Sequence, residues 1–322
     1  MPGEFDLIRR YFDSISGDHP SVQLGIGDDC ALLTSSPHTE LAISVDTLVE
    51  GVHFLPDIDP EDLAWRLVAS SVSDLAAMGA SPKWLTLACT LNAPSQEWLA
   101  AFSKGLAEAC HHYSLILVGG DTTSGQQQVF TAQVHGEVPL GMALKRSGAK
   151  AGDAIVVSGT LGDSRAGLAL LTAECESGSD YLLERYYRPT ARLALGEALR
   201  GIANSAVDVS DGLLADLGHL LTASGVGAEI HTESLPLSAD IKDLAPDLAE
   251  RWALSGGEDF ELCFTLPQDR VPELQQISER LALPLTLVGK ITQQTGITLL
   301  KSGEPVPLPA SLGFNHFGNE HE

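Results

Sequence analysis

The chain has 322 residues, of which 44% are hydrophobic and 19% charged, and its formal net charge is −24 at pH 7. This composition is typical of a globular protein without large disordered regions, and the length favours two domains over one. The negative charge disfavours nucleic acid and anionic membranes as partners, and it lets nucleotides approach only when divalent cations accompany them.

Apolar periodicity predicts strands and helices that alternate in both halves of the chain, which implies two α/β or α+β domains. In the first half, helices are expected over 5–12, 60–78 and 94–113, and strands over 30–33, 41–49, 84–91, 115–118 and 129–138. In the second half, helices are expected over 164–174, 192–204 and 212–224, and strands over 154–158, 206–209 and 262–266. The basic segment 139–152, with its proline and glycines, separates the halves and predicts domains over 1–140 and 141–322.

Aspartates recur beside glycine turns and at the ends of apolar strands. The segment Gly25–Asp29 places two adjacent carboxylates after two glycines, and burying such a pair without a cation is costly. Asp46 closes an apolar strand, where the two-residue period puts it on the same face as Ser44. As a turn residue beside Thr47, Asp46 would need no metal.

Asp74 and Asp121 are also either metal ligands or ordinary structural residues. Asp74 falls on the apolar stripe of the helix over 60–78, within about 20° of Leu67 around the axis. It needs a partner there, unless it reaches water at the edge of the stripe. Asp121 follows the pair Gly119-Gly120 after a buried strand, where backbone N–H groups could approach a phosphate. The same residues also make an ordinary turn.

In the second half, Asp208 lies in an apolar strand and Asp211 at the start of a helix, on either side of Ser210. N–H groups at a helix start favour anions, although Asp211 could equally be a helix cap and nothing more. Arg146 either binds phosphate or belongs to a solvated basic linker. Glu258 follows a second glycine pair and either approaches a ligand or faces water. The economical interpretation of all the carboxylates is one multi-metal site that binds polyphosphate.

The five cysteines include no C-x-x-C pair, so we expect reduced core thiols and neither a zinc site nor a disulfide framework. The amino terminus lacks the basic and apolar regions of a secretory leader, and no apolar run reaches the roughly 18 residues of a membrane span. These features predict a cytoplasmic protein.

Motifs along most of the chain resemble those of the thiamine-monophosphate kinase family: GEFDLI, GIGDDCALL, SVDTLVEGVHF, SDLAAMGA, GGDTT, KRSGAKAGD, DVSDGL and SGGEDFELCF. The resemblance implies the two-domain fold of aminoimidazole ribonucleotide synthetase, with residues 1–140 binding ATP and metal and pairing their sheet across a homodimer. Residues 141–322 would complete the nucleotide and substrate site. The implied activity is ATP-dependent phosphorylation of thiamine monophosphate to thiamine diphosphate, the last step of thiamine diphosphate biosynthesis.

The resemblance also assigns residue roles. Several Mg²⁺ ions would be held by Asp29, Ser44, Val45 through its carbonyl, Asp46, Asp74, Asp121, Asp208 and Asp211. Nucleotide-binding positions would be Gly120, Asp121, Arg146 and Ser210, and substrate-binding positions His53, Glu258 and Phe314. Val45 stands where the family often has Thr, Phe314 where it often has another aromatic residue, and the role of Asp28 is left open. No covalent catalytic residue is implied, because a substrate phosphate oxygen would be the nucleophile.

Two other functions stay open: another ATP-using enzyme of the same superfamily, and a non-catalytic nucleotide or metal sensor. Selenophosphate synthetase would need a reactive cysteine in a glycine-rich amino-terminal segment, and this chain has none before Cys30. The hydrogenase-maturation enzyme would need a carboxy-terminal cysteine, which the final residues also lack. A sensor would not need the complete acidic set that is present here.

Overall fold

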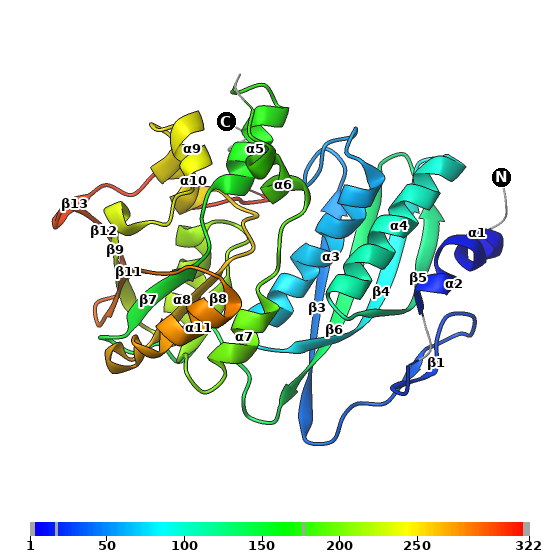
Figure 1. Cartoon of the computed structure of the whole chain (residues 1–322), viewed down its shortest axis with the longest axis horizontal. Helices are drawn as coiled ribbons and strands as arrows, with labels where there is room; N and C mark the ends of the chain where they lie inside the picture. Colours follow the sequence, from blue (N-terminus) through cyan, green and yellow to red (C-terminus); the bar gives the residue numbers. More distant parts are fainter. Residues whose placement is uncertain (1–3, 17–18, 176–177, 318–322) are drawn as a thin grey trace. The chain divides into compact units, whose positions relative to one another are not determined.

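The computed structural model describes residues 4–16, 19–175 and 178–317. The chain forms two compact units, one of residues 1–75 and 80–143, the other of residues 76–79 and 144–322. Both mix helices with sheets, as the sequence predicts (Figure 1). In the described part of the chain no helix is long and apolar enough to cross a membrane.

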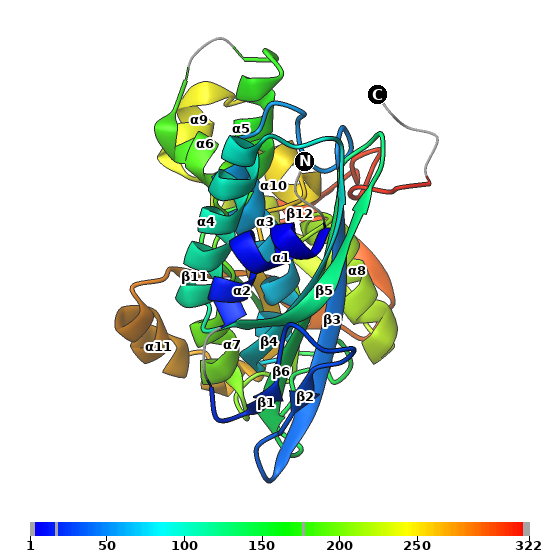
Figure 2. The ribbon, with the colours of Figure 1, turned by 90° about the vertical axis from the view of Figure 1, so that its right-hand side faces the viewer.

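The amino-terminal unit is a four-stranded sheet with two long helices on one face, as Figures 1 and 2 show. Its strands run in the order β3-β6-β4-β5, antiparallel except for the parallel pair β4 and β5. The elements are α1 (Glu4–Tyr11), α2 (Asp13–Ser16), β1 (Val22–Leu24), β2 (Leu32–Leu33), β3 (Thr39–Val49), α3 (Pro60–Ala77), β4 (Ser81–Leu91), α4 (Gln96–His112), β5 (Ile116–Ser124) and β6 (Val129–Pro139).

The two faces of this sheet differ in burial. On the covered face Phe130 of β6 stacks with Phe102 of α4, with ring centroids 5.0 Å apart, and neither side chain is exposed by more than 1%. On the other face the alternate residues Leu41, Ile43 and Val45 of β3 are 47%, 53% and 58% exposed. Strand β3 therefore has the predicted two-residue alternation, and the face with Leu41, Ile43 and Val45 is directed to solvent.

The carboxy-terminal unit is built on a seven-stranded sheet in the order β13-β12-β9-β11-β7-β10-β8, in which only β12 and β9 are parallel neighbours. Its strands are β7 (Ala154–Ser158), β8 (Ser205–Asp208), β9 (Gly227–His231), β10 (Leu262–Leu266), β11 (Leu285–Thr292), β12 (Gly296–Lys301) and β13 (Glu304–Val306). Its α-helices are α5 (Asp163–Leu171), α6 (Asp180–Tyr187), α7 (Leu193–Leu199), α8 (Leu213–Ser224), α9 (Ala239–Leu244), α10 (Ala249–Ser255) and α11 (Glu273–Leu281).

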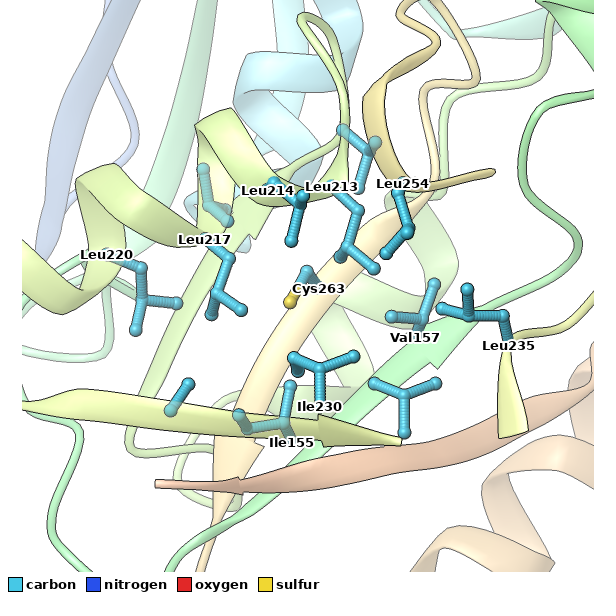
Figure 3. Close-up of a cluster of buried hydrophobic side chains, with 14 of the residues drawn as sticks. Ile155, Val157, Leu213, Leu214, Leu217, Leu220, Ile230, Leu235, Leu254 and Cys263 are labelled. Atoms are coloured by element: carbon cyan, nitrogen blue, oxygen red, sulfur yellow. The ribbon is translucent and has the colours of Figure 1, made fainter. Parts of the chain in front are cut away.

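Both faces of this sheet carry apolar cores, which explains the uninterrupted apolar runs of its central strands. On one face, Ile155 and Val157 of β7 lie under Leu213 and Leu217 of α8 (Figure 3). On the other face, the alternate residue Val156 packs in a second core with residues of α7 and α11. The predicted strands over 154–158 and 262–266 are confirmed residue for residue.

Some predicted elements differ from the structure. The strand expected to end at Val118 continues as β5 through the glycine pair, so the predicted turn there is wrong. The helix expected over 192–204 ends at Leu199. The sequence analysis did not reveal the strands β9, β11, β12 and β13 or the helices α6, α9, α10 and α11.

Candidate functional site

Strand β3 and helix α3 bring three of the predicted metal ligands to the covered face of the amino-terminal sheet. The Ser44 hydroxyl donates a hydrogen bond to Oδ2 of Asp74, so the aspartate on the apolar stripe has the partner that the sequence required. Asp46 lies two residues after Ser44 on the same face of β3, opposite the fully buried Ala132 of β6. The interpretation of Asp46 as a turn residue is therefore wrong.

The strand register separates Asp121 from this group. One row of paired residues crosses the sheet through Asp46, Ala132, Leu87 and Gly120, and the next row through Thr47, Thr131, Ala88 and Asp121. Because paired residues share a face and successive residues alternate, Asp121 lies on the face opposite to Asp46. The exposed side chain of Val45 lies on the same face as Asp121.

Gly120 has a packing reason to be glycine. A Cβ atom at this position would lie 1.9 Å from the carbonyl oxygen of Leu87 on the neighbouring strand β4, a separation that no side chain tolerates. The glycine therefore permits the close parallel pairing of β4 and β5. The Asp121 charge reaches this strand too, since it adds to burial in raising the pKa of the Cys89 thiol.

The acidic pair after Gly27 and the histidine after β3 lie elsewhere in the same unit. Asp28 and Asp29 are both exposed, and Asp28 Oδ1 accepts the N–H of Asp29 at 2.8 Å. Solvent therefore screens the two charges, and the cost of burying the pair without a cation does not arise here. His53 is half-buried, and its Nδ1 accepts the N–H of Val49 at 3.1 Å, which closes the turn after β3.

In the carboxy-terminal unit, three segments distant in sequence meet at the loop Asp208–Gly212. Asp208 ends β8 with 4% of its surface exposed. The carbonyl of Ser210 accepts the N–H of Glu258 at 2.7 Å, and the carbonyl of Asp211 accepts the N–H of Phe314 at 3.0 Å. The structure thus joins predicted metal-binding, nucleotide-binding and substrate-binding residues through their main chains.

Charges of both signs surround the Asp211 carboxyl. Burial raises its pKa, and the charges of His316, His219 and Arg146 oppose that shift, while the charge of Glu258 adds to it. Arg146 is exposed and its carbonyl accepts the Ser224 hydroxyl at 3.0 Å. The Arg146 charge therefore favours the ionised form of the Asp211 carboxyl.

The N–H groups of this loop are already occupied. Those of Ser210, Asp211 and Gly212 all donate to Oδ2 of Asp216, at 3.0, 3.0 and 3.1 Å. The expectation that they face a bound anion is wrong, because a carboxylate of the chain itself takes that place. Burial raises the pKa of Asp216 to about 7, with the Asp211 charge adding and the three N–H groups opposing. The sequence signal for Asp216 was an aspartate on an apolar helix stripe, as for Asp74.

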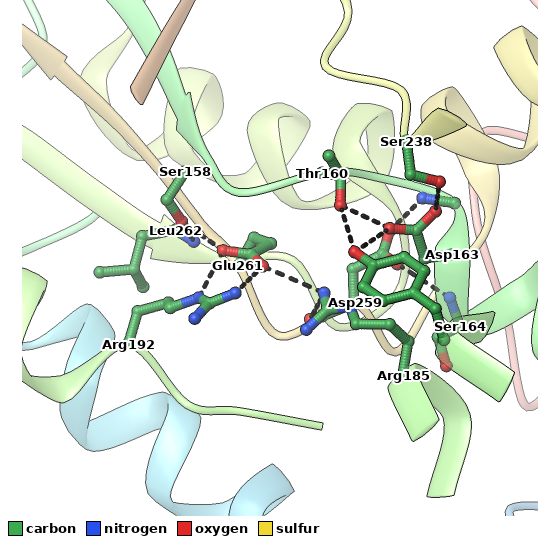
Figure 4. A network of polar contacts seen from close by, with 12 residues as sticks. Ser158, Thr160, Asp163, Ser164, Arg185, Arg192, Ser238, Asp259, Glu261 and Leu262 are labelled. Atoms are coloured by element: carbon green, nitrogen blue, oxygen red, sulfur yellow. Dashed lines mark hydrogen bonds and ion pairs between the residues drawn. The ribbon is translucent and has the colours of Figure 1, made fainter. Parts of the chain in front are cut away.

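A buried ionic network holds the segment that follows Glu258 (Figure 4). Glu261 is fully buried, and its carboxylate accepts hydrogen bonds from Ser158 Oγ at 2.6 Å, Arg185 Nη2 at 3.0 Å and Arg192 Nε at 2.7 Å. Burial lowers the pKa of Arg185, but the charges of Glu261 and Asp259 outweigh it and the net shift is upward. Glu258 itself has a φ of 67°, a left-handed conformation that costs energy outside glycine.

The candidate ligands come from both units. Among residues 4–16, 19–175 and 178–317, no group of three or more His, Cys, Asp or Glu side chains is arranged to hold a metal ion. Mg²⁺ commonly takes one or two carboxylates and completes its coordination with water and substrate phosphates. The donors at Ser44, Asp46 and Asp74 are hard oxygens of the kind that Mg²⁺ prefers.

Comparison with known proteins gives consistent matches over both units. The family models for the N-terminal and C-terminal domains of AIR synthase related protein match residues 27–138 and 150–301. The thiamine-monophosphate kinase of Escherichia coli (strain K12) is 50% identical over 321 residues, 98% of each chain. The crystal structure of thiamine-monophosphate kinase from Stenotrophomonas maltophilia K279a matches with a TM-score of 0.86 at 42% identity, over 94% of this chain and 98% of that one. AaThiL complexed with AMPPCP and TMP matches with a TM-score of 0.78 at 35% identity, over 88% and 89%.

Proposed function

Since this chain belongs to the thiamine-monophosphate kinase family, we propose that it transfers the γ-phosphoryl group of ATP to thiamine monophosphate and forms thiamine diphosphate. The observation that carries the proposal is the contact of Ser44 with Asp74 beside Asp46, on a face where the neighbouring residues of β6 and β4 are apolar. Neighbouring carboxylates at such a face repel one another and lose hydration, and bound cations that also bind phosphates would offset both costs.

The donor set supports several Mg²⁺ ions. Ser44, Asp46 and Asp74 would hold Mg²⁺ on the covered face of the amino-terminal sheet, and Asp121 would do so on the other face. The carbonyl of Val45 is a separate candidate, because β6 and β4 lie between β3 and β5. In the second unit, Asp208 and Asp211 are the corresponding donors, and we keep the exposed Asp29 as a further candidate. Bound Mg²⁺ neutralises phosphate charge and stabilises the transferring phosphoryl group.

The residues themselves position the reactants. The attacking group is a phosphate oxygen of thiamine monophosphate, which is ionised at neutral pH and needs no side-chain base. Gly120, Arg146 and Ser210 are proposed for the nucleotide, with Arg146 supplying charge to its phosphates. His53, Glu258 and Phe314 are proposed for the substrate, where the Glu258 carboxylate complements the cationic thiazolium and Phe314 stacks on a ring.

The test is turnover of ATP with thiamine monophosphate, followed as formation of thiamine diphosphate. We expect product with Mg²⁺ and none with excess EDTA, because the acidic donors repel phosphate without a cation. ATP at about 100 times its dissociation constant should also add about 2.7 kcal/mol of apparent stability when Mg²⁺ is present. An equal thermal shift in EDTA would contradict metal-mediated binding, and ATP use without thiamine diphosphate would favour a sister enzyme of the superfamily.

We also propose a homodimer formed through the amino-terminal sheet. In the described part of the chain β3 pairs only with β6, so its outer edge is open, and its exposed row includes Ile43. An open apolar edge strand is a site of association. Ile43→Asp should therefore yield a monomer by light scattering at micromolar concentration. Leu287→Asp, at a 44% exposed position on β11, is the control that should stay dimeric. A monomeric wild-type chain would refute the dimer.

We place this reaction in the cytoplasm. All five cysteines are free in the structure, and Cys89, Cys110 and Cys263 are buried thiols. Reduced cysteines are typical of cytosolic proteins, where ATP is also available.

A further inference from the structure

The loop Asp208–Gly212 is held on both sides of its backbone. Two of its carbonyl groups accept the N–H groups of Glu258 (2.7 Å) and Phe314 (3.0 Å). Three consecutive N–H groups, those of residues 210–212, converge on one carboxylate oxygen of Asp216, at 3.0, 3.0 and 3.1 Å. The main chain of the loop therefore connects Asp216 on one side with two candidate substrate contacts on the other.

A carboxylate is suited to this place. Asp216 is 2% exposed, on the side of α8 that also buries Leu213 and Leu217. A buried carboxylate is costly unless donors compensate, and bonds from N–H to an ionised oxygen are stronger than those between neutral groups. Three donors to one oxygen restrict the backbone of three successive residues, so the loop directs side chains, and not N–H groups, toward a ligand.

We propose that Asp216 is a positioning residue for phosphoryl transfer. It fixes Ser210 and Asp211 directly, and through their carbonyls it sets the places of Glu258 and Phe314. It touches no substrate itself. This inference rests on the proposed function, because it assigns the loop to nucleotide and metal binding and the two tethered residues to thiamine monophosphate.

A helix cap that only stabilises α8 would involve the same hydrogen bonds, so the test needs a readout beyond stability. Asp216→Asn keeps the shape and one acceptor oxygen but removes the charge. Asp153→Asn is the matched control, since Asp153 is 4% exposed and its Oδ2 accepts the Lys150 N–H (2.9 Å) and Asn204 Nδ2 (2.8 Å). Asp153 touches none of the candidate site residues through these bonds.

The first measurement is independent of activity. Hydrogen exchange, followed by mass spectrometry on peptides that span the loop Asp208–Gly212, should accelerate in Asp216→Asn and stay at the wild-type rate in Asp153→Asn. Asp216→Leu, of similar size and without an acceptor, should accelerate exchange further. Should the leucine variant fail to fold, the asparagine variant still decides. Unchanged exchange in Asp216→Asn would overturn the proposal.

The second measurement is kinetic. Loss of a supporting contact behind binding residues commonly costs about 10- to 100-fold, and we expect a fall of this size in kcat/KM for Asp216→Asn. In this variant KM should rise for both ATP and thiamine monophosphate, because the loop Asp208–Gly212 positions the candidate contacts of both reactants. Asp153→Asn should keep the wild-type values of KM and kcat. A variant that melts earlier but keeps both KM values and kcat would show a purely structural role and refute the proposal. Wild-type protein without turnover would instead refute the proposed function and leave the exchange measurement standing.

Discussion

Asp46→Asn should nearly abolish thiamine diphosphate formation. Asp46 is the acidic centre of the group on β3 that supports the proposed function, beside Ser44 and its hydrogen-bond partner Asp74. Removing one group that stabilises charge in the transition state costs about 10²- to 10³-fold in kcat. Asparagine keeps the size and a carbonyl oxygen, so a loss of this size would report the missing charge and not a change of packing.

The matched control for this variant lies on the same strand. Glu40 belongs to the same face of β3, and it accepts the N–H of Gly141 at 2.9 Å. Glu40→Gln therefore removes one negative charge from the same strand without touching the candidate ligands, and it should keep wild-type kcat. Asp46→Asn should also lose the Mg²⁺-dependent thermal shift with ATP. Activity within a few-fold of the wild type in Asp46→Asn would remove Asp46 from the metal site.

Glu261→Ala should produce the largest loss of stability. The Glu261 side chain is fully buried and is the shared acceptor of Arg185 and Arg192, of which Arg185 is itself buried. Removing one partner of a buried ion pair leaves an uncompensated charge and commonly costs about 3–5 kcal/mol. When unfolding of the carboxy-terminal unit is followed by urea titration, the midpoint of its transition should fall to a lower urea concentration, because the free energy of unfolding is smaller.

Two further variants show whether burial causes the effect. Arg192→Met leaves Glu261 with Arg185, so it should destabilise less than Glu261→Ala. Glu273→Ala removes the exposed partner of Arg270, a pair that water screens, and its midpoint should move little. If the midpoint for Glu261→Ala moved no more than that for Glu273→Ala, the network around Glu261 would not stabilise the fold. Two units unfold in this chain, so the transitions must be assigned separately.

Local chemistry in the sequence was enough to find much of the candidate site. The two-residue period of β3 put Ser44 and Asp46 on one face, and the helical period put Asp74 on the face of α3 that meets them. The same argument, a charged residue on an apolar stripe, applies to Asp216. The sequence analysis missed this residue because it considered the motif DVSDGL, which ends at Leu213.

Residues that act through distant partners could not be found in this way. Glu261 is separated from Arg185 by 76 positions and from Arg192 by 69 positions along the chain, and only the fold brings them into contact. Glu258 and Phe314 are joined to the loop Asp208–Gly212 by main-chain hydrogen bonds, which leave no trace in residue type. Such contacts depend on strand order and connection geometry, which local periodicity does not encode.

The sequence by itself determined the two α+β halves, the buried strands β7 and β10, and the chemistry of the acidic motifs, because these follow from composition and from periods of two and 3.6 residues. Only the tertiary structure decided on which face of the sheet Asp121 lies and which N–H groups of the loop Asp208–Gly212 remain available. Asp121 shows why: it lies four residues after the buried Leu117, an even spacing that would keep both residues on one face of a regular strand. An irregularity in the pairing of β4 with β5 skips Val118, shifts the alternation by one residue and sends Asp121 to the other face. Strand register is a property of two strands together, and a single stretch of sequence does not contain it.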